Sequence, residues 1–284
     1  MLHWSLLARV AADSCTVENA RNEPRLADLR AGAWGQLGNA LRVAGRLEEA
    51  EEMMQAALGY AQSGTGDLAL RARLLCQTAS LLSYQRHCDS ALGLLDESEG
   101  IYLEIGERHS LACTNVTRAV AYAYAGEPDR AVQVLEAIVR RIDGEEDPHL
   151  LLAARHNLMR AYIDLQQPEK ALALISEMRE LRRQLEEPLI LLRSSWQEGM
   201  LFRILGYLEA AEAALVAARK GMIERGLIYE VVIISHDLAA VYLRQGRTAK
   251  LEETIEDTRS IVHTQRVPQE ALVSLRELER VVSH

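Results

Sequence analysis

Two histidine and cysteine pairs are the residues of this sequence that could bind a metal or supply a nucleophile. His109 and Cys113 lie four residues apart, which places them on one face of a helix, and His87 adjoins Cys88. A structural zinc site needs four converging ligands, and a cysteine nucleophile needs an orienting acid and an oxyanion arrangement. Neither set stands at a recognisable spacing, so we predict buried or capping roles, with no metal and no catalytic residue.

Motifs for phosphate binding and for membrane insertion are also missing from the sequence. Neither GxGxxG nor GxxxxGK[ST] occurs, so no nucleotide or other cofactor is predicted. No apolar run approaches the roughly 18 residues that span a bilayer, and the apolar start has no basic flank of the signal-peptide kind. The cysteines are scattered, at Cys15, Cys76, Cys88 and Cys113. We expect reduced thiols and a cytoplasmic protein without membrane contact.

The charge of the chain restricts its partners. It has 284 residues, with 32 Lys and Arg against 41 Asp and Glu, for a formal net charge of −9. A protein that binds nucleic acid through its overall charge needs a basic surface to displace counterions from phosphates. We therefore predict no nucleic-acid partner, and hydrophobic residues at 49% indicate a folded core.

The elements that must position any site repeat along the chain. A small residue recurs at Ala50, Ala91, Ala131, Ala171 and Ala211, at spacings of 41, 40, 40 and 40, and the next step of 40 reaches Leu251. Around each of these positions, two segments with apolar residues at helical spacing flank a tight turn. The sequence therefore predicts six helical hairpins.

Turn residues mark where each predicted first helix ends. Glycines that can adopt the left-handed conformation stand at Gly45, Gly126, Gly206 and Gly246. Prolines fit the first turn of the following helix, at Pro128 and Pro168 inside hairpins and at Pro148, Pro188 and Pro268 between them. Small residues at Gly38, Ala79, Ala119, Gly199 and Ala239 predict that the second helix crosses close to the first.

The spacing of these residues resembles the tetratricopeptide repeat. The signature residues are Trp34, Leu37, Gly38, Leu41, Gly45, Ala50 and Ala57. The resemblance implies an all-α, right-handed superhelical solenoid of about six hairpins over residues 26–265, with capping helices at 1–25 and 266–284. Its period is longer than the usual 34 residues of the family and resembles the variety of about 40 residues found in bacterial signalling regulators and in some eukaryotic scaffold proteins.

Two charged residues break the repeat pattern. Arg118 and Glu198 occupy the position where Leu37, Leu158 and Leu238 stand in other repeats. An unpaired buried charge costs several kcal/mol, on the order of 3 to 5. We therefore expect both side chains to reach solvent or to pair.

The concave wall of such a solenoid is built by the first helix of every hairpin, and helical phasing predicts which side chains it presents. The predicted groove residues are Gln36, Asn39, Arg42, Arg73, Gln77, Tyr84, Tyr124, His156, Asn157, Arg160, Arg193, Trp196, Gln197, Arg203, His236 and Arg244. The inward set includes six arginines against two acids, Asp164 and Asp237, although the whole chain is acidic.

A basic groove favours a particular class of partner. Arginine offers a rigid fork of donors for carboxylate or phosphate, and Asn and Gln side chains can bind the main chain of an extended peptide. We predict a non-enzymatic adaptor that binds an acidic or C-terminal segment of another protein, with Asn39 at the position of the family's peptide-clamping asparagine. The opposing interpretation is that these arginines are solvated or pair with acids on neighbouring helices.

Two other functions remain open from the sequence. The resemblance to bacterial regulators implies a sensor whose superhelix responds to a small peptide or metabolite, and self-association through exposed ends is compatible with the composition. An enzyme would need a site around His156, Trp196 and His236. No effector domain is recognisable outside the repeats, which favours the adaptor.

Overall fold

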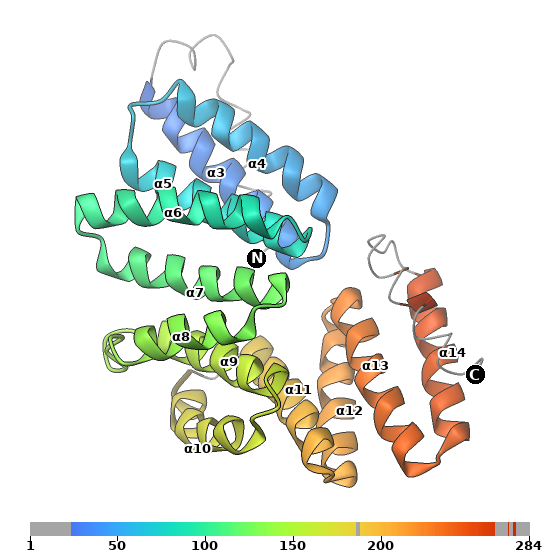
Figure 1. The fold of residues 1–284 in the computed structure, drawn as a ribbon. Coiled ribbons are helices and arrows are strands. Elements are labelled where there is room, and N and C mark those ends of the chain that lie inside the picture. Colours follow the sequence, from blue (N-terminus) through green and yellow to red (C-terminus); the bar gives the residue numbers. More distant parts are fainter. Residues whose placement is uncertain (1–23, 186–187, 265–271, 273–274, 277–284) are drawn as a thin grey trace. The chain divides into compact units, whose positions relative to one another are not determined.

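The computed structural model describes residues 24–185, 188–264, 272 and 275–276. These residues form twelve helices joined by turns, with no strand among them. The chain divides into two compact units, residues 1–142 and 143–284, each of which contains three of the helical hairpins. The fold is all-α, and within each unit the hairpins follow one another as in an α-solenoid (Figure 1).

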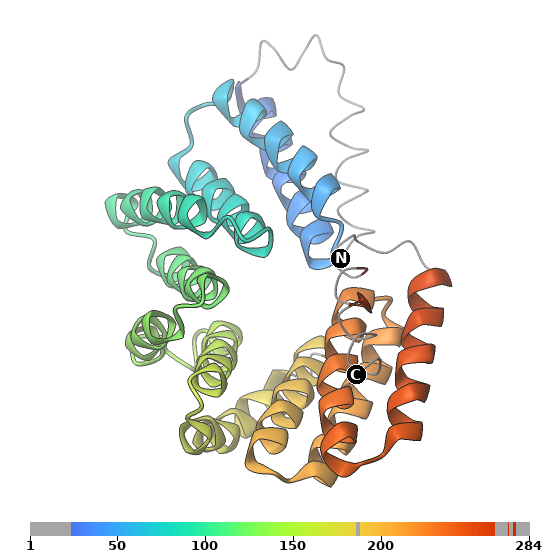
Figure 2. The same cartoon turned by 45° about the vertical axis from the view of Figure 1, so that its right-hand side comes forward.

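The helices of the two units are 12 to 20 residues long and alternate with turns. Unit 1 contains α3 (Pro24–Val43), α4 (Leu47–Gln62), α5 (Leu68–Tyr84), α6 (Cys88–Ile105), α7 (Arg108–Ala125) and α8 (Pro128–Val139). Unit 2 contains α9 (Pro148–Asp164), α10 (Pro168–Leu185), α11 (Pro188–Leu205), α12 (Leu208–Glu224), α13 (Ile228–Gln245) and α14 (Thr248–Thr264). Figure 2 shows how α12, α13 and α14 lie side by side within unit 2.

The turn that closes each hairpin uses one left-handed residue. The four predicted glycines all have positive φ: Gly45 at 74°, Gly126 at 79°, Gly206 at 85° and Gly246 at 70°. The other two hairpins place Arg86, with φ 65°, and Gln166, with φ 55°, at the same repeat position. The glycine prediction is confirmed, and two repeats adopt the same turn with a side chain that carries some strain.

The small residues allow close helix packing, as the sequence predicted. A Cβ on Gly38 would lie 3.1 Å from the carbonyl oxygen of Ala50, and one on Gly199 would lie 2.6 Å from Cγ of Leu215. Both glycines therefore mark places where the second helix passes against the backbone of the first. Ala50 and Ala211 are fully buried at these crossings, which explains why five of the six second helices have an alanine at this position.

Both charges that break the repeat pattern are paired, which confirms the expectation. Arg118 forms ion pairs with Asp96 and with Glu99, the latter at 2.6 Å. Glu198 pairs with Arg182 at 2.5 Å. In each case the partner comes from the second helix of the preceding hairpin, so an ion pair between consecutive hairpins replaces the usual leucine contact.

Residues 1–23 of the predicted N-terminal capping helix and Pro268 lie outside the described residues, and residues 24 and 25, also predicted in that cap, belong to α3. From the predicted C-terminal cap, the structure describes Leu272, Leu275 and Arg276. Leu275 is buried in a cluster with Ile228, Val232 and Val262 of the last hairpin. Among the described helices, none combines the length and the apolar character that crossing a membrane requires.

Candidate functional site

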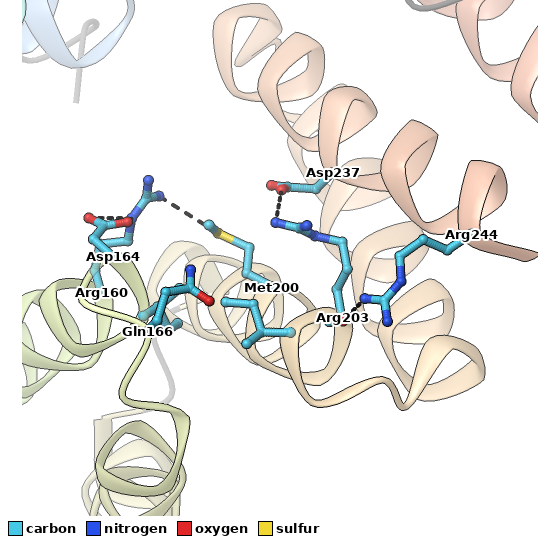
Figure 3. Close-up of a pocket in the computed structure, with 9 residues that line it drawn as sticks. Arg160, Asp164, Gln166, Met200, Arg203, Asp237 and Arg244 are labelled. Carbon is cyan, nitrogen blue, oxygen red and sulfur yellow. Dashed lines mark hydrogen bonds and ion pairs between the residues drawn. The ribbon is translucent and has the colours of Figure 1, made fainter.

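The first helices of unit 2 border an open pocket of about 560 Å³, which we call the unit 2 pocket (Figure 3). Its walls come from α9, α11 and α13 and from the turn after α9. The lining residues are Arg160, Ile163, Asp164, Gln166, Met200, Arg203, Ile204, Asp237 and Arg244. Three of the six predicted groove arginines therefore lie around one cavity.

Arg160 is held at the α9 wall of this pocket. Its Nε lies 3.0 Å from Oδ1 of Asp164, one helical turn further along α9. Its Nη1 is 3.7 Å from the sulfur of Met200 on α11. Because the side chain of Arg160 is still 42% exposed, the guanidinium faces the cavity as well as its partner.

Arg203 and Asp237 connect α11 to α13 at the side of the pocket. Nη2 of Arg203 lies 3.5 Å from Oδ1 of Asp237, and the other oxygen of Asp237 accepts a 2.8 Å hydrogen bond from Nε1 of Trp196. Burial raises the pKa of Asp237, and the Trp196 hydrogen bond and the Arg203 charge oppose that change only in part. The Nε of Arg203 is buried and has no hydrogen-bond partner among the described residues.

Arg244 differs from the other two arginines because it has no acidic partner in the described part of the chain. Its Nη1 donates to the main-chain carbonyl of Arg203, near the C-terminal end of α11. The residue is exposed and stands in the last turn of α13. With Asp164 and Asp237 already paired, the pocket has one guanidinium more than its carboxylates can balance. An anion is the chemical group that this excess charge favours.

The other predicted groove residues of unit 2 bond mainly within the chain. His156 is largely buried, and its Nε2 lies 2.5 Å from Oγ of Ser194. Burial, together with the charges of Arg182 and Arg193, lowers the pKa of His156 to about 4, so its imidazole is neutral at pH 7. Arg193 lies 3.6 Å from a carboxylate oxygen of Glu230, whose pKa is raised by burial.

The remaining predicted groove residues of unit 2 are two amides and a second histidine. Nδ2 of Asn157 donates to the carbonyl of Ala153 in its own helix at 3.0 Å. Nε2 of Gln197 donates to the carbonyl of His156 at 3.2 Å. His236 is partly buried on α13. Each of the two amides therefore donates a hydrogen bond to the protein's own backbone, and neither lines the unit 2 pocket.

In unit 1, three predicted residues stack along the ends of α3, α5 and α7. The guanidinium of Arg42 lies over the ring of Tyr84, 4.9 Å from its centroid, and the Tyr84 and Tyr124 rings are 5.2 Å apart. Arg86 lies over the other tyrosine, Tyr124, at 4.9 Å. Oδ1 of Asn39 accepts from two nitrogens of Arg42, at 3.1 and 2.9 Å. This arrangement holds Arg42 by a cation–π contact and by an amide.

A second cavity, of about 670 Å³, lies between α3 and α5, and we call it the unit 1 pocket. Its lining residues are Arg25, Asp28, Leu29, Gly32, Ala33, Gln36, Thr65, Asp67, Leu70 and Arg73. Two of the predicted groove residues, Gln36 and Arg73, belong to it. Another, Gln77, has a buried Oε1 without a hydrogen-bond partner in the described residues.

The histidine and cysteine pairs do not gather into a metal site within the described residues. Sγ of Cys113 lies 3.5 Å from Nε2 of His109, and Cys76, Cys88 and Cys113 are free thiols. Within the described residues, no three His, Cys, Asp or Glu side chains come together as metal ligands would.

Several pocket residues were missed by the sequence analysis. Ile163, Met200 and Ile204 stand one repeat away from Arg203, Arg160 and Arg244 respectively. The repeat register was therefore the signal that could have identified them, because equivalent positions of adjacent first helices meet at the same wall. Gln166 could not be found in this way, since it lies in the turn after α9.

Comparison with known families supports the repeat interpretation. A model described as tetratricopeptide repeat matches residues 31–63, and a model described as PPR repeat matches residues 156–182. Both are families of helical hairpins. No curated protein matches the sequence.

Solved structures with a similar fold cover most of the chain. Two crystal structures of nearly identical TPR-like repeats, from a Podosopora anserina protein described as a kinesin light chain, match with 22% identity and a TM-score of 0.51. They cover 68% and 70% of this chain and 95% and 98% of their own. Aspartyl phosphate phosphatase F from Bacillus subtilis matches with 16% identity and a TM-score of 0.56, over 97% of this chain and 79% of that one. At these identities the likeness establishes the fold alone.

Proposed function

We propose that this chain, a helical-repeat protein of the tetratricopeptide type, binds an acidic segment of a partner protein in the unit 2 pocket. The binding is non-catalytic, and the chain acts as an adaptor or regulatory module in the cytoplasm. The segment supplies a carboxylate, from an acidic side chain or from a C-terminus, to the arginine donors around the cavity. Proteins built from such repeats generally serve as interaction scaffolds, which agrees with this role.

One observation carries the proposal, namely the excess of guanidinium groups at the unit 2 pocket. Arg160 and Arg203 have carboxylate partners, whereas Arg244 bonds only to a backbone carbonyl in the described residues. A carboxylate from outside would balance the charge of Arg244 and could share the donors of Arg160. The apolar side chains of Met200 and Ile204 beside it would contact the carbon atoms of the same segment.

The structure changes which residues we assign to recognition. Asn157 and Gln197 were predicted to hold the peptide backbone, but their amides already donate to carbonyls of the chain. Arg193 is engaged with Glu230. The proposal for unit 2 therefore rests on Arg160, Arg203 and Arg244.

A second candidate function is a sensor that binds a small anion or a short peptide in the same pocket. The volume of about 560 Å³ favours it, since pockets for small ligands commonly enclose about 300 to 1,000 Å³. Both candidates need the same arginines, so the identity of the ligand distinguishes them.

Charge reversal tests the proposal. We would replace Arg160 and Arg244 together by glutamate and use the intact chain to capture proteins from the native cytoplasm for mass spectrometry. Arg203 is kept, because Arg203→Glu would place a second carboxylate beside the buried Asp237. The matched control is Arg259→Glu on α14, whose side chain is 39% exposed with a partner in its own helix, much as Arg160 is 42% exposed.

The expected result is a specific protein with an acidic segment that the wild type and the control capture and the double variant loses. Circular dichroism must show the same helix content in all three. Capture of the same proteins by the double variant would contradict the proposal. Recovery of a bound small molecule in place of a protein would favour the sensor.

A further inference from the structure

The unit 1 pocket has a different chemical character from the unit 2 pocket. Its apolar lining residues are aliphatic, and we call Leu29, Ala33 and Leu70, which line it together with Gly32, the floor of this pocket. Leu29 is 70% exposed, the highest exposure among the large hydrophobic side chains of the described residues. An apolar group that entered this cavity would cover Leu29 and remove it from water.

Both carboxylates of the unit 1 pocket already accept hydrogen bonds from other residues of the protein. The carboxylate of Asp28 accepts hydrogen bonds from the amide and the hydroxyl of Thr65, at 3.2 and 2.5 Å. Asp67 is the N-cap of α5, where its side chain accepts from the amide of Leu70 at 3.0 Å. Its negative charge also interacts favourably with the positive N-terminal end of the α5 dipole. Within the described residues, neither carboxylate pairs with an arginine.

The two arginines of the unit 1 pocket are therefore available to bind a carboxylate of another molecule. Arg25 and Arg73 line the cavity from α3 and α5, and neither has an acidic partner within the described part of the chain. Arg73 extends over the floor, since its Nη2 lies 3.5 Å from where a Cβ on Gly32 would stand. Two guanidinium groups with free donors therefore border an apolar floor.

We infer that the unit 1 pocket binds an apolar side chain of a partner segment in which an acidic residue is adjacent to the apolar one. The apolar side chain packs on Leu29, Ala33 and Leu70, and the neighbouring carboxylate accepts from Arg25 or Arg73. The inference rests on the proposed function in one respect, because both assign partner segments to surfaces of first helices. It adds a subsite that selects for an apolar residue.

A substitution at Gly32 can fill this subsite without removing a side chain that forms a hydrogen bond or an ion pair. Its built Cβ would lie at ordinary contact distance, 3.5 Å from Arg73 and 4.0 Å from Leu70, so Gly32→Ala fits and should stabilise α3. Gly32→Leu would extend into the cavity and occupy the place of the ligand's side chain. The two variants form a matched pair, because both replace Gly32 within α3, but only the leucine is large enough to fill the pocket and reach the guanidinium of Arg73.

The probe is a fluorescein-labelled nonapeptide with one leucine between two glutamates, in a background of glycine and serine. Fluorescence anisotropy of its binding to the full chain is measured at low salt. We expect Gly32→Leu to weaken binding at least about tenfold and Gly32→Ala to change it less than about twofold. Arg73→Gln, and replacement of the peptide's leucine by alanine, should each weaken binding about tenfold.

Two results would overturn the inference. One is an absence of binding to the wild-type chain, and the other is equal affinity of the wild type and Gly32→Leu. The Arg160→Glu and Arg244→Glu double variant separates this test from that of the proposed function, because it alters unit 2 alone. Retained nonapeptide binding by that variant, with loss in Gly32→Leu, supports the unit 1 subsite whatever the fate of the unit 2 proposal.

Discussion

Arg244 donates a hydrogen bond from its guanidinium to the main-chain carbonyl of Arg203, 41 residues earlier in the sequence. That carbonyl belongs to the last turn of α11, where it also accepts from the amide of Gly206 at 3.3 Å. Carbonyls at this end of a helix carry partial negative charge. The bond fixes the Arg244 side chain at the edge of the unit 2 pocket without neutralising it. Its positive charge remains available to an anion, which is the basis of the proposed function.

Close helix packing at Gly199 predicts a stability difference between two glycine substitutions. In Gly199→Ala, the new Cβ would lie 2.6 Å from Cγ of Leu215, so α11 and α12 must move apart, at a cost of about 1 to 3 kcal/mol. The matched change is Gly93→Ala in α6, where nothing lies within 4 Å of the new Cβ. It should stabilise the protein by about 0.5 to 1 kcal/mol. Urea denaturation measures both, and equal midpoints would contradict the predicted crossing.

The two left-handed turns without glycine predict another pair of effects. Gln166→Gly relieves a positive φ of 55° and should stabilise unit 2 by about 1 kcal/mol. Arg86→Gly relieves a φ of 65°, but it also removes the 2.9 Å hydrogen bond from Arg86 to the Tyr124 carbonyl and the contact with that ring. We expect its gain to be smaller than that of Gln166→Gly. Thermal denaturation compares them, and a larger gain at position 86 would show that its side-chain contacts contribute nothing.

The ion pairs of Arg118 allow a prediction of how stability changes when Arg118 is replaced by leucine, the residue that other repeats have at this position. Arg118→Leu restores the residue that Leu37 and Leu158 supply elsewhere, and the carboxylates left behind are at least one-third exposed. Because both carboxylates keep contact with solvent, removal of the arginine leaves no fully buried charge, and leucine restores the apolar packing. We therefore expect a change within about 1 kcal/mol. Arg118→Ala should cost about 3 kcal/mol, because it loses both the ion pairs and the packing. Guanidinium denaturation of both variants tests this, and equal losses would argue against leucine-like packing.

The lowered pKa of His156 predicts acid sensitivity. The folded pKa of about 4 lies below the ordinary value of 6.5, so the unfolded chain binds more protons between these pH values. Stability from this residue is therefore complete above pH 6.5 and falls as the pH decreases toward 4. At pH 5 the loss relative to pH 7 should be about 2 kcal/mol.

The control for this effect is His156→Gln, which keeps a polar group near Ser194 but does not titrate. The difference between the urea midpoints at pH 7 and pH 5 should shrink in this variant. A difference as large as that of the wild type would assign the acid sensitivity to other groups.

The sequence predicted the helical repeat well because its signals are local. The spacing of 40 residues, the turn glycines and the small residues at Gly38 and Gly199 each specify backbone geometry within one hairpin. The left-handed Arg86 and Gln166 were not foreseen, because residues with a Cβ disfavour positive φ and reveal no preference for it in their type. Interactions with the neighbouring repeat hold Arg86 in place, and these depend on tertiary packing.

The candidate site was predictable only in part. Helical phase placed Arg160, Arg203 and Arg244 among the inward residues, and all three line the unit 2 pocket. The phase could not show which inward side chains bond within the chain, since the Trp196 to Asp237 hydrogen bond depends on how α11 packs on α13. The unit 1 pocket extends to Arg25 and Leu29, which lie earlier in α3 than Gln36, the first residue of the predicted groove.

The most direct test of the central claim is the affinity of the full chain for the acidic segment of a captured partner. Isothermal titration calorimetry would compare the wild type, Arg244→Gln and the control Arg259→Gln at low and moderate salt. We predict that Arg244→Gln binds about tenfold more weakly at low salt and depends less on salt, because one charge-assisted contact is lost, while the control is unchanged. Equal affinities of the wild type and Arg244→Gln at both salt concentrations would contradict the claim that the unit 2 pocket recognises an anion.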